Sequence, residues 1–257
     1  MIASLGMYDA PPLQAPNDAL WGAIRDGLRR RGVSAPDALT RGAAAYWPAW
    51  QAPDLVLSQT CGFPYRARLH GKVTLIGTPD HGIEGCAPGH YCSVLLGRED
   101  DPRQDLAAFD GATLAYNEAM SQSGWAAPLA EAARAGIRFR VGPETGFHLA
   151  SARAVAEGRA DIAALDAVTW AQICSAGLNP PGLREIGRTA PTPALPYIAA
   201  AGADAAATFA ALEEGIGALP GDLADRLHLR GLVRIPADAY LAVPTPPPPA
   251  HFGRTAA

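Results

Sequence analysis

The chain has 257 residues, of which 49% are hydrophobic and 18% charged, and its formal net charge is −4. This composition predicts a globular protein with enough apolar residues for one large or two medium domains. The negative net charge argues against a nucleic-acid-binding protein, which normally carries a basic patch, and no apolar run has the length that a membrane helix needs.

The first half of the chain predicts short elements separated by polar loops. A helix is expected from a cap at Asn17 or Asp18 to a stop at Gly32. The aromatic residues at 46–50 are expected to pack in a core. A hydroxyl-rich loop at 58–62 follows the second strand. Strands are expected at 2–7, 54–57, 72–77 and 91–96.

The second half alternates more regularly between strands and helices. Its strands are expected at 114–116, 137–141, 161–165, 183–186 and 197–200. Its helices are expected at 126–135, 147–157, 168–176, 205–219 and 222–229. This alternation predicts an α/β protein whose sheet is rich in parallel strands. The tail from residue 244 is Pro-rich and is expected to be extended.

The stretch 115–125 joins an apolar strand to a helix and is the main candidate site. Its polar and glycine positions are Asn117, Ser121, Gln122, Ser123 and Gly124. Hydroxyls, an amide and backbone N–H groups at a helix N-terminus suit an anion, although an ordinary Ser N-cap is the alternative. Because Pro128 lacks an N–H, we expect the helix to begin near Ala126 and to leave the preceding loop for a ligand.

Cysteines and histidines give no sign of a metal or of catalysis. No two of Cys61, Cys86, Cys92 and Cys174 have Cys-x-x-Cys spacing, so zinc is not expected. Cys61 and Cys86 lie in Gly-rich loops and could pair in an oxidising compartment, but buried thiols are the favoured interpretation. No metal, other cofactor or catalytic residue is predicted.

Six polar or glycine-containing segments follow one another along the chain, at 58–64, 91–96, 121–124, 145–151, 158–166 and 187–193. In this order they resemble segments of the phosphate/phosphonate-type substrate-binding proteins of ABC transporters. The resemblance covers residues 1 to about 243 and implies an α/β, two-lobed type II periplasmic-binding-protein fold. The hinge would consist of two chain crossings, near 91–98 and 187–196. The first lobe would comprise 1–90 and 192–257, and the second 91–191.

The resemblance also implies ligand contacts at particular positions. A tyrosine that begins the crossing strand contacts ligand, the hydroxyl loop holds the phosphonate group, and a histidine contacts the anion. An acidic residue near the end of a second-lobe strand and the end of the first strand also line the cleft. The predicted ligand-binding set is Tyr8, Ser58, Thr60, Tyr91, Asn117, Ser121, Gln122, Ser123, Gly124, His148 and Asp166.

The function implied is the binding of a small oxyanion, of the phosphate, phosphite or phosphonate class, in a cleft between the lobes. The protein would be a non-enzymatic component of ABC transport, with a permease as partner and a periplasmic location. The chain shows no basic segment, long apolar segment or cleavage site after Met1. A cytoplasmic location therefore stays open, with an enzyme or a sensor on the same fold as the alternative.

Asp166 adds an expectation about the charge of the ligand. A carboxylate close to an anion leaves two like charges uncompensated. If Asp166 contacts the ligand, we expect that ligand to carry a proton or an ammonium group facing it.

Overall fold

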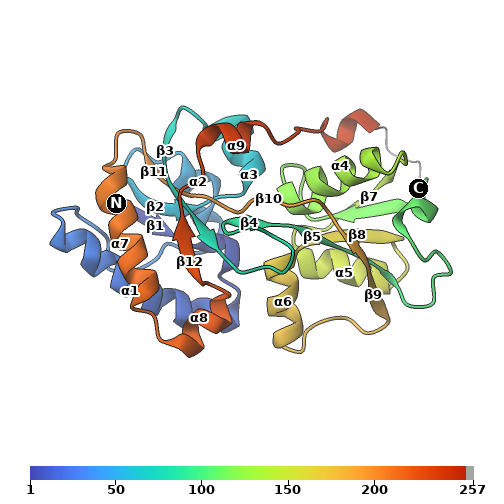
Figure 1. Cartoon of the computed structure of the whole chain (residues 1–257), viewed down its shortest axis with the longest axis horizontal. Coiled ribbons are helices and arrows are strands. Elements are labelled where there is room, and N and C mark those ends of the chain that lie inside the picture. Colours follow the sequence, from blue (N-terminus) through green and yellow to red (C-terminus); the bar gives the residue numbers. More distant parts are fainter. Residues whose placement is uncertain (253–257) are drawn as a thin grey trace. The chain divides into compact units, whose positions relative to one another are not determined.

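The computed structural model describes residues 1–252, and its chain divides into two units (Figure 1). Unit 1 contains residues 1–90 and 193–242, and unit 2 contains residues 91–192 and the described residues from 243 onward. The short strands β4 (His90–Tyr91) and β10 (Thr192–Pro193) pair with each other and carry the first two crossings of the chain between the units. A third crossing follows Ala242.

The C-terminal tail corrects the expected lobe boundaries. Residues 192–257 were assigned to the first lobe and only two crossings were expected, but the described tail from Val243 belongs to unit 2. The indole Nε1 of Trp125 donates to the carbonyl of Pro247 at 3.1 Å, and the ring of Phe252 packs edge-on against Trp125 at 5.7 Å. Proline lacks an N–H, so this segment attaches through rings and carbonyls rather than as a strand. Residues 253–257 lie outside the described part of the chain.

Unit 1 is built on a five-stranded sheet of mixed direction. β1 and β2 are parallel, β11 is antiparallel to both β2 and β3, and β12 is antiparallel to β3. The expectation of a sheet rich in parallel strands is therefore wrong for this unit. In sheet order the strands are β1 (Ile2–Ser4), β2 (Leu55–Gln59), β11 (Tyr197–Ala200), β3 (Val73–Asp80) and β12 (Gly231–Val233).

Two apolar layers cover this sheet. Along β11, Tyr197 and Ala199 belong to one core cluster and Ile198 to the other, as side chains alternate across a strand. Helices α1 (Gln14–Arg30), α7 (Ala205–Gly217) and α8 (Gly221–Leu227) contribute to the first cluster. The short helices α2 (Trp47–Trp50) and α9 (Ala237–Leu241) and the turn Tyr65–Leu69 contribute to the second. The remaining short helix is α3 (Gly62–Pro64).

Unit 2 repeats this plan with another five-stranded sheet. Parallel pairing joins β6 to β7 and β8, whereas β5 is antiparallel to β8 and β9. Helix α4 covers one face of the sheet and α5 and α6 the other (Figure 1). The strands, in sheet order, are β7 (Arg140–Glu144), β6 (Thr113–Tyr116), β8 (Ile162–Asp166), β5 (Ser93–Arg98) and β9 (Leu183–Arg188). The helices are α4 (Ala127–Arg134), α5 (His148–Ala156) and α6 (Ala167–Ser175).

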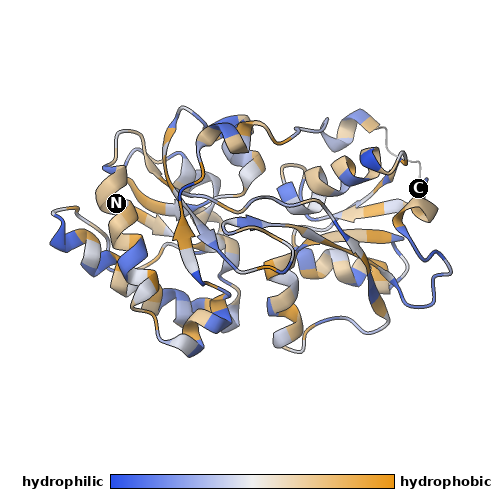
Figure 2. Cartoon of the chain, in the orientation of Figure 1, coloured by the Kyte–Doolittle hydropathy of each residue, from blue (hydrophilic) through white to orange (hydrophobic). Residues whose placement is uncertain are grey.

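Hydropathy explains most of the elements, and local contacts explain the exceptions. The central strands of unit 2 are hydrophobic, while the loop after β5 is hydrophilic (Figure 2). Helix α1 begins at Gln14, so Asn17 is not its cap. Asn17 is instead buried inside the helix, where its amide donates to the carbonyl of Tyr8 at 2.9 Å. The strand expected at 137–141 begins only at Arg140, and β12 was not predicted.

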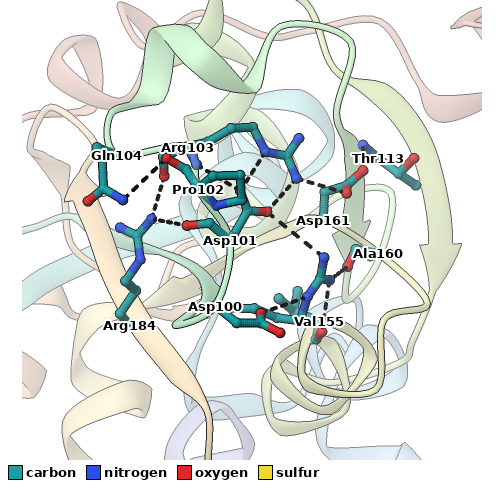
Figure 3. Close-up of polar contacts among 11 residues, drawn as sticks. Asp100, Asp101, Pro102, Arg103, Gln104, Thr113, Val155, Ala160, Asp161 and Arg184 are labelled. Atoms are coloured by element: carbon teal, nitrogen blue, oxygen red, sulfur yellow. Dashed lines mark hydrogen bonds and ion pairs between the residues drawn. The ribbon is translucent and has the colours of Figure 1, made fainter.

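The hydrophilic loop after β5 is fixed by a cluster of charged residues (Figure 3). Asp101, whose side chain is 2% exposed, accepts hydrogen bonds from the Arg103 side chain at 2.8 and 2.5 Å. Arg103 also bonds Asp161 at 3.0 Å, and the second oxygen of Asp161 accepts from the N–H of Thr113. Arg184 donates to the Asp101 carbonyl. The cluster therefore ties the loop to the starts of β6 and β8.

Asp101→Asn should destabilise the protein in a pH-dependent way. The Arg103 guanidinium lowers the pKa of Asp101 to about 2, so the pair stabilises the fold above about pH 4 and loses that effect as the pH falls through 2. At neutral pH we expect the variant to lose about 2 kcal/mol of unfolding free energy. Urea unfolding of wild type and variant at neutral pH and at about pH 2 would measure this difference in unfolding free energy.

The neighbouring change Asp100→Asn is the matched control, because the Asp100 side chain is 86% exposed. Exposed ion pairs contribute little to stability. Equal losses in the two variants would contradict the assigned role of Asp101.

Candidate functional site

A wide helical turn after β6 holds most of the predicted anion-binding residues. Residues Gln122–Ala126 form a π-type turn that continues directly into α4; we refer to 121–126 as the serine turn. The hydroxyl of Ser121 caps it by accepting from the N–H of Gly124 at 2.9 Å. The loop expected to be free before Ala126 is therefore already helical, although α4 itself begins close to the expected residue.

The width of this turn depends on a glycine. The side-chain oxygen of Asn117 lies so close to Gly124 that a Cβ there would be 2.0 Å from it. That oxygen is buried and has no hydrogen-bond partner among the described residues. The carbonyl of Asn117 accepts from the N–H of Gly146, which joins the loops after β6 and β7. Asn117 is thus placed by its backbone, while its side-chain oxygen is left without a donor.

His148, the first residue of α5, meets the serine turn from the next loop. Its Nε2 lies 3.0 Å from the hydroxyl oxygen of Ser123. The residue is partly exposed, but its Nδ1 is buried without a partner among the described residues. Burial lowers the pKa of the imidazole to about 4, so the ring is neutral near pH 7. A buried ring nitrogen without a hydrogen-bond partner is uncommon in folded proteins.

Asp166 has a structural role in addition to its predicted contact with the ligand. Its carboxylate caps α6 by accepting from the N–H groups of Val168 at 2.8 Å and Thr169 at 3.1 Å. Asp166 pairs across the sheet with Ser93, whose hydroxyl donates to the carbonyl of Ser123 at 2.9 Å. Ser93 supports the serine turn, and sequence reasoning missed it because it lies inside an apolar strand.

The remaining predicted residues are placed as follows. Gln122 is buried within the serine turn, and Tyr91 is buried at the end of β4. In unit 1, Ser58 shares a hydrogen bond of 2.7 Å with Ser4, whose hydroxyl also donates to Ala45. The Ser58 hydroxyl also donates to the carbonyl of Gln59 at 3.4 Å, so it already has partners within unit 1. Thr60, by contrast, has a buried hydroxyl without a partner among the described residues.

The second-unit cluster is electrostatically suited to a small anion without containing a cation. Ser121, Ser123 and His148 offer neutral polar groups, and the first N–H groups of a helix have no acceptor within the helix. Directed hydrogen bonds and a helix N-terminus can hold a desolvated oxyanion. The charged cluster around Asp101 lies at the opposite ends of the same strands.

Within residues 1–252, no group of acidic, histidine or cysteine side chains has a metal-binding arrangement, and no disulfide is present.

Comparison with known proteins identifies the family of the chain. Residues 54–240 match the family described as "ABC transporter, phosphonate, periplasmic substrate-binding protein". The chain belongs to this family. The family is a substrate-binding transport component rather than a class of enzyme, which confirms the resemblance seen in the sequence. No curated protein matches the chain significantly.

Solved structures confirm the type II periplasmic-binding fold expected for a member of this family. XAC2383 from Xanthomonas citri, bound to chloride, is 18% identical and has a TM-score of 0.70; the match covers 95% of this chain and 98% of that one. PhnD1 from Prochlorococcus marinus, in complex with methylphosphonate, is 17% identical with a TM-score of 0.66 and coverages of 88% and 90%. The phosphonate-transporter component PA3383 from Pseudomonas aeruginosa is 15% identical with a TM-score of 0.60 and coverages of 87% and 78%.

Across residues 1–252, no helix combines the length and apolarity needed to cross a membrane.

A substrate-binding component of this family binds a small ligand. The polar groups of the serine turn and His148 are the natural place in unit 2 to look for it.

Gly124→Ala should disrupt the serine turn. The added Cβ would meet the Asn117 oxygen at 2.0 Å and the Ser121 hydroxyl at 3.3 Å, so the turn or Asn117 has to move. We expect a loss of about 2 kcal/mol of stability, measured by chemical unfolding, together with a rearranged turn.

Gly187→Ala is the matched control, because the same methyl group would meet nothing within 4 Å in β9 of the same unit. If the two alanine variants are equally stable, the close packing at Gly124 does not constrain the turn.

Proposed function

We propose that this protein binds a phosphonate-class oxyanion through the serine turn and His148 of unit 2. The observation that supports this most directly is the Ser123–His148 hydrogen bond of 3.0 Å, which leaves the buried Nδ1 of His148 without a partner among the described residues. Buried polar atoms are nearly always satisfied by protein, water or ligand. A bound oxyanion would satisfy Nδ1 and the N–H groups at the start of the turn together.

The chemistry of His148 favours an anionic ligand. A negative charge nearby favours the protonated form of an imidazole, which opposes the effect of burial on its pKa. In the imidazolium form both ring nitrogens donate. Nε2 would then donate to Ser123, whose own proton would be free to donate to the ligand. Binding would thus align the Nε2 of His148 and the hydroxyl of Ser123 as successive hydrogen-bond donors towards the ligand.

The ligand class rests on the family and on a relative of the same fold. PhnD1 was solved with methylphosphonate, and XAC2383 with chloride. A site of hydroxyls and a helix N-terminus suits the tetrahedral oxygens of a phosphonate group, because each oxygen can accept several hydrogen bonds. We therefore place methylphosphonate, phosphite and phosphate first among the ligands to be tested.

The other predicted ligand contacts remain part of the proposal, and the hydrogen bonds that each side chain already makes favour some over others. Thr60 is favoured, because its buried hydroxyl has no partner among the described residues. Ser58 is less favoured, because its hydroxyl already bonds Ser4 and the carbonyl of Gln59. Asp166 caps α6 through its Oδ1, and its contact with a proton or an ammonium group of the ligand stays a prediction. Tyr8 and Tyr91 stay in the proposed set.

Family membership also supports a transport role. We propose that the protein delivers its ligand to an ABC transporter permease and that it works in the periplasm, as the family description implies. Fractionation of cells that produce the tagged native protein would test the location. Recovery of the protein only in the cytosolic fraction would contradict it.

Ligand binding can be tested by calorimetry and thermal unfolding with methylphosphonate, phosphite, phosphate and sulfate. A ligand that binds only the folded state raises the unfolding temperature. We expect stabilisation by at least one phosphorus oxyanion, and a roughly tenfold or greater loss of affinity in Ser123→Ala, since a hydrogen bond to a charged group is removed.

Ser175→Ala, at an exposed position at the end of α6, is the control and should bind as the wild type does. Absence of stabilisation by all four oxyanions would contradict the proposed function. Unchanged affinity in Ser123→Ala would place binding away from the serine turn.

A further inference from the structure

Unit 1 contains a second buried histidine with an unused nitrogen. His81 follows β3 directly and is only 4% exposed. Its ring packs edge-on against Tyr8, with the ring centres 5.2 Å apart. Its Nδ1 lies 2.8 Å from the carbonyl oxygen of His228, and its Nε2 is buried without a partner among the described residues.

The contact with His228 determines which nitrogen carries the proton. A carbonyl oxygen can only accept, so Nδ1 must donate to it. Burial lowers the pKa of His81 to about 4, although Asp80 opposes this shift and His228 contributes to it in both directions. The ring is thus neutral near pH 7, and its Nε2 carries a lone pair. That nitrogen can accept a hydrogen bond but cannot give one.

The backbone that supplies this carbonyl is itself unusual. His228 ends α8 in the left-handed conformation, with φ at 49°, and within residues 1–252 it is the sole non-glycine residue with a positive φ. A side chain in this region costs energy that the surroundings must offset. Here the conformation holds the carbonyl against His81 and fixes its tautomer.

Strand direction places His81 with two of the predicted ligand contacts. Because β11 is antiparallel to both β2 and β3, these two strands run in the same direction, and β1 is parallel to β2. Thr60 and His81 directly follow β2 and β3, and Tyr8 lies shortly after β1. All three are therefore at one edge of the sheet, the edge where α/β proteins bind ligands.

We infer that His81 is a specificity-determining residue whose Nε2 accepts a hydrogen bond from a protonated oxygen of the ligand. This inference rests on the oxyanion-binding function proposed above. It predicts a preference for oxyanions that carry a proton, such as hydrogen phosphate or a hydrogen phosphonate, over aprotic ones.

Phosphate and sulfate make the sharpest comparison. In mildly alkaline solution both are tetrahedral dianions, but only phosphate has an O–H to donate. Towards sulfate, the lone pair of Nε2 would face an oxygen with no proton, and the buried nitrogen would stay unsatisfied. A neutral acceptor also avoids the repulsion that a carboxylate would exert on an anion.

The test is calorimetry of phosphate and sulfate with wild type, His81→Phe and His81→Gln. Phenylalanine keeps a planar ring but has no acceptor, so we expect the preference for phosphate over sulfate to fall roughly tenfold. In His81→Gln the amide oxygen can accept, and part of the preference should return. His70→Gln is the control, because His70 is an exposed histidine of the same unit.

A spectroscopic measurement on the wild type keeps the test independent of the folding of the variants. In a histidine-labelled protein, the Nε2 signal of His81 should have the shift of an unprotonated nitrogen and should move when phosphate is added but not when sulfate is added. The inference would be overturned if the ratio of phosphate to sulfate affinity were unchanged in His81→Phe, because both affinities stayed the same or fell equally. It would also be overturned if the Nε2 signal of the wild type did not respond to phosphate. If wild type binds phosphorus oxyanions in any of these cases, the proposed function survives. If it binds none, both fail.

Discussion

The hydrogen bond between Ser123 and His148 is the contact on which the proposed site depends. It joins the loop after β6 to the loop after β7, so that a serine from one helix start and a histidine from the next form one polar surface. Two further contacts hold it in place: the N–H of Gly146 donates to Asn117, and the hydroxyl of Ser93 donates to the Ser123 carbonyl. The parallel pairing of β6 with β7 and β8 brings these loops to one edge of the sheet.

In unit 2 the arginines around Asp101 lie away from this edge, whereas Arg188, which pairs with Val94 at the end of β9, lies at it. Arg103 and Arg184 act at the other ends of the strands, where they hold the loop after β5 (Figure 3). The serine turn and His148 themselves offer an anion directed donors rather than a charged side chain. Such donors favour a ligand of matching shape, whereas a single lysine would attract any anion.

Much of this could be predicted from the sequence, because the informative signals are local. Hydroxyls and glycine between an apolar strand and a helix identify the serine turn, and alternation of strands and helices gives the fold class. What failed depended on contacts distant in the chain. The tail was assigned to the wrong unit because its attachment is one indole N–H and one ring contact on Trp125. The role of His81 could not be predicted, since nothing near it in the sequence reveals the carbonyl of His228.

The role of Asp166 also could not be assigned from the sequence alone. An acidic residue after a buried strand is compatible with both a ligand contact and a helix cap, and only the positions of the Val168 and Thr169 N–H groups show that it caps α6. Both N–H groups are accepted by Oδ1, so the cap is compatible with a ligand contact of the carboxylate, which stays a prediction. The preference for a protonated oxygen inferred above is ascribed to the neutral imidazole of His81.

A crystal structure of the protein with methylphosphonate would test the central claim most directly. The account predicts the phosphonate oxygens within about 3.2 Å of the Ser123 hydroxyl and of Nδ1 of His148. A well-ordered ligand bound elsewhere, with the serine turn and His148 unchanged and unoccupied, would contradict it.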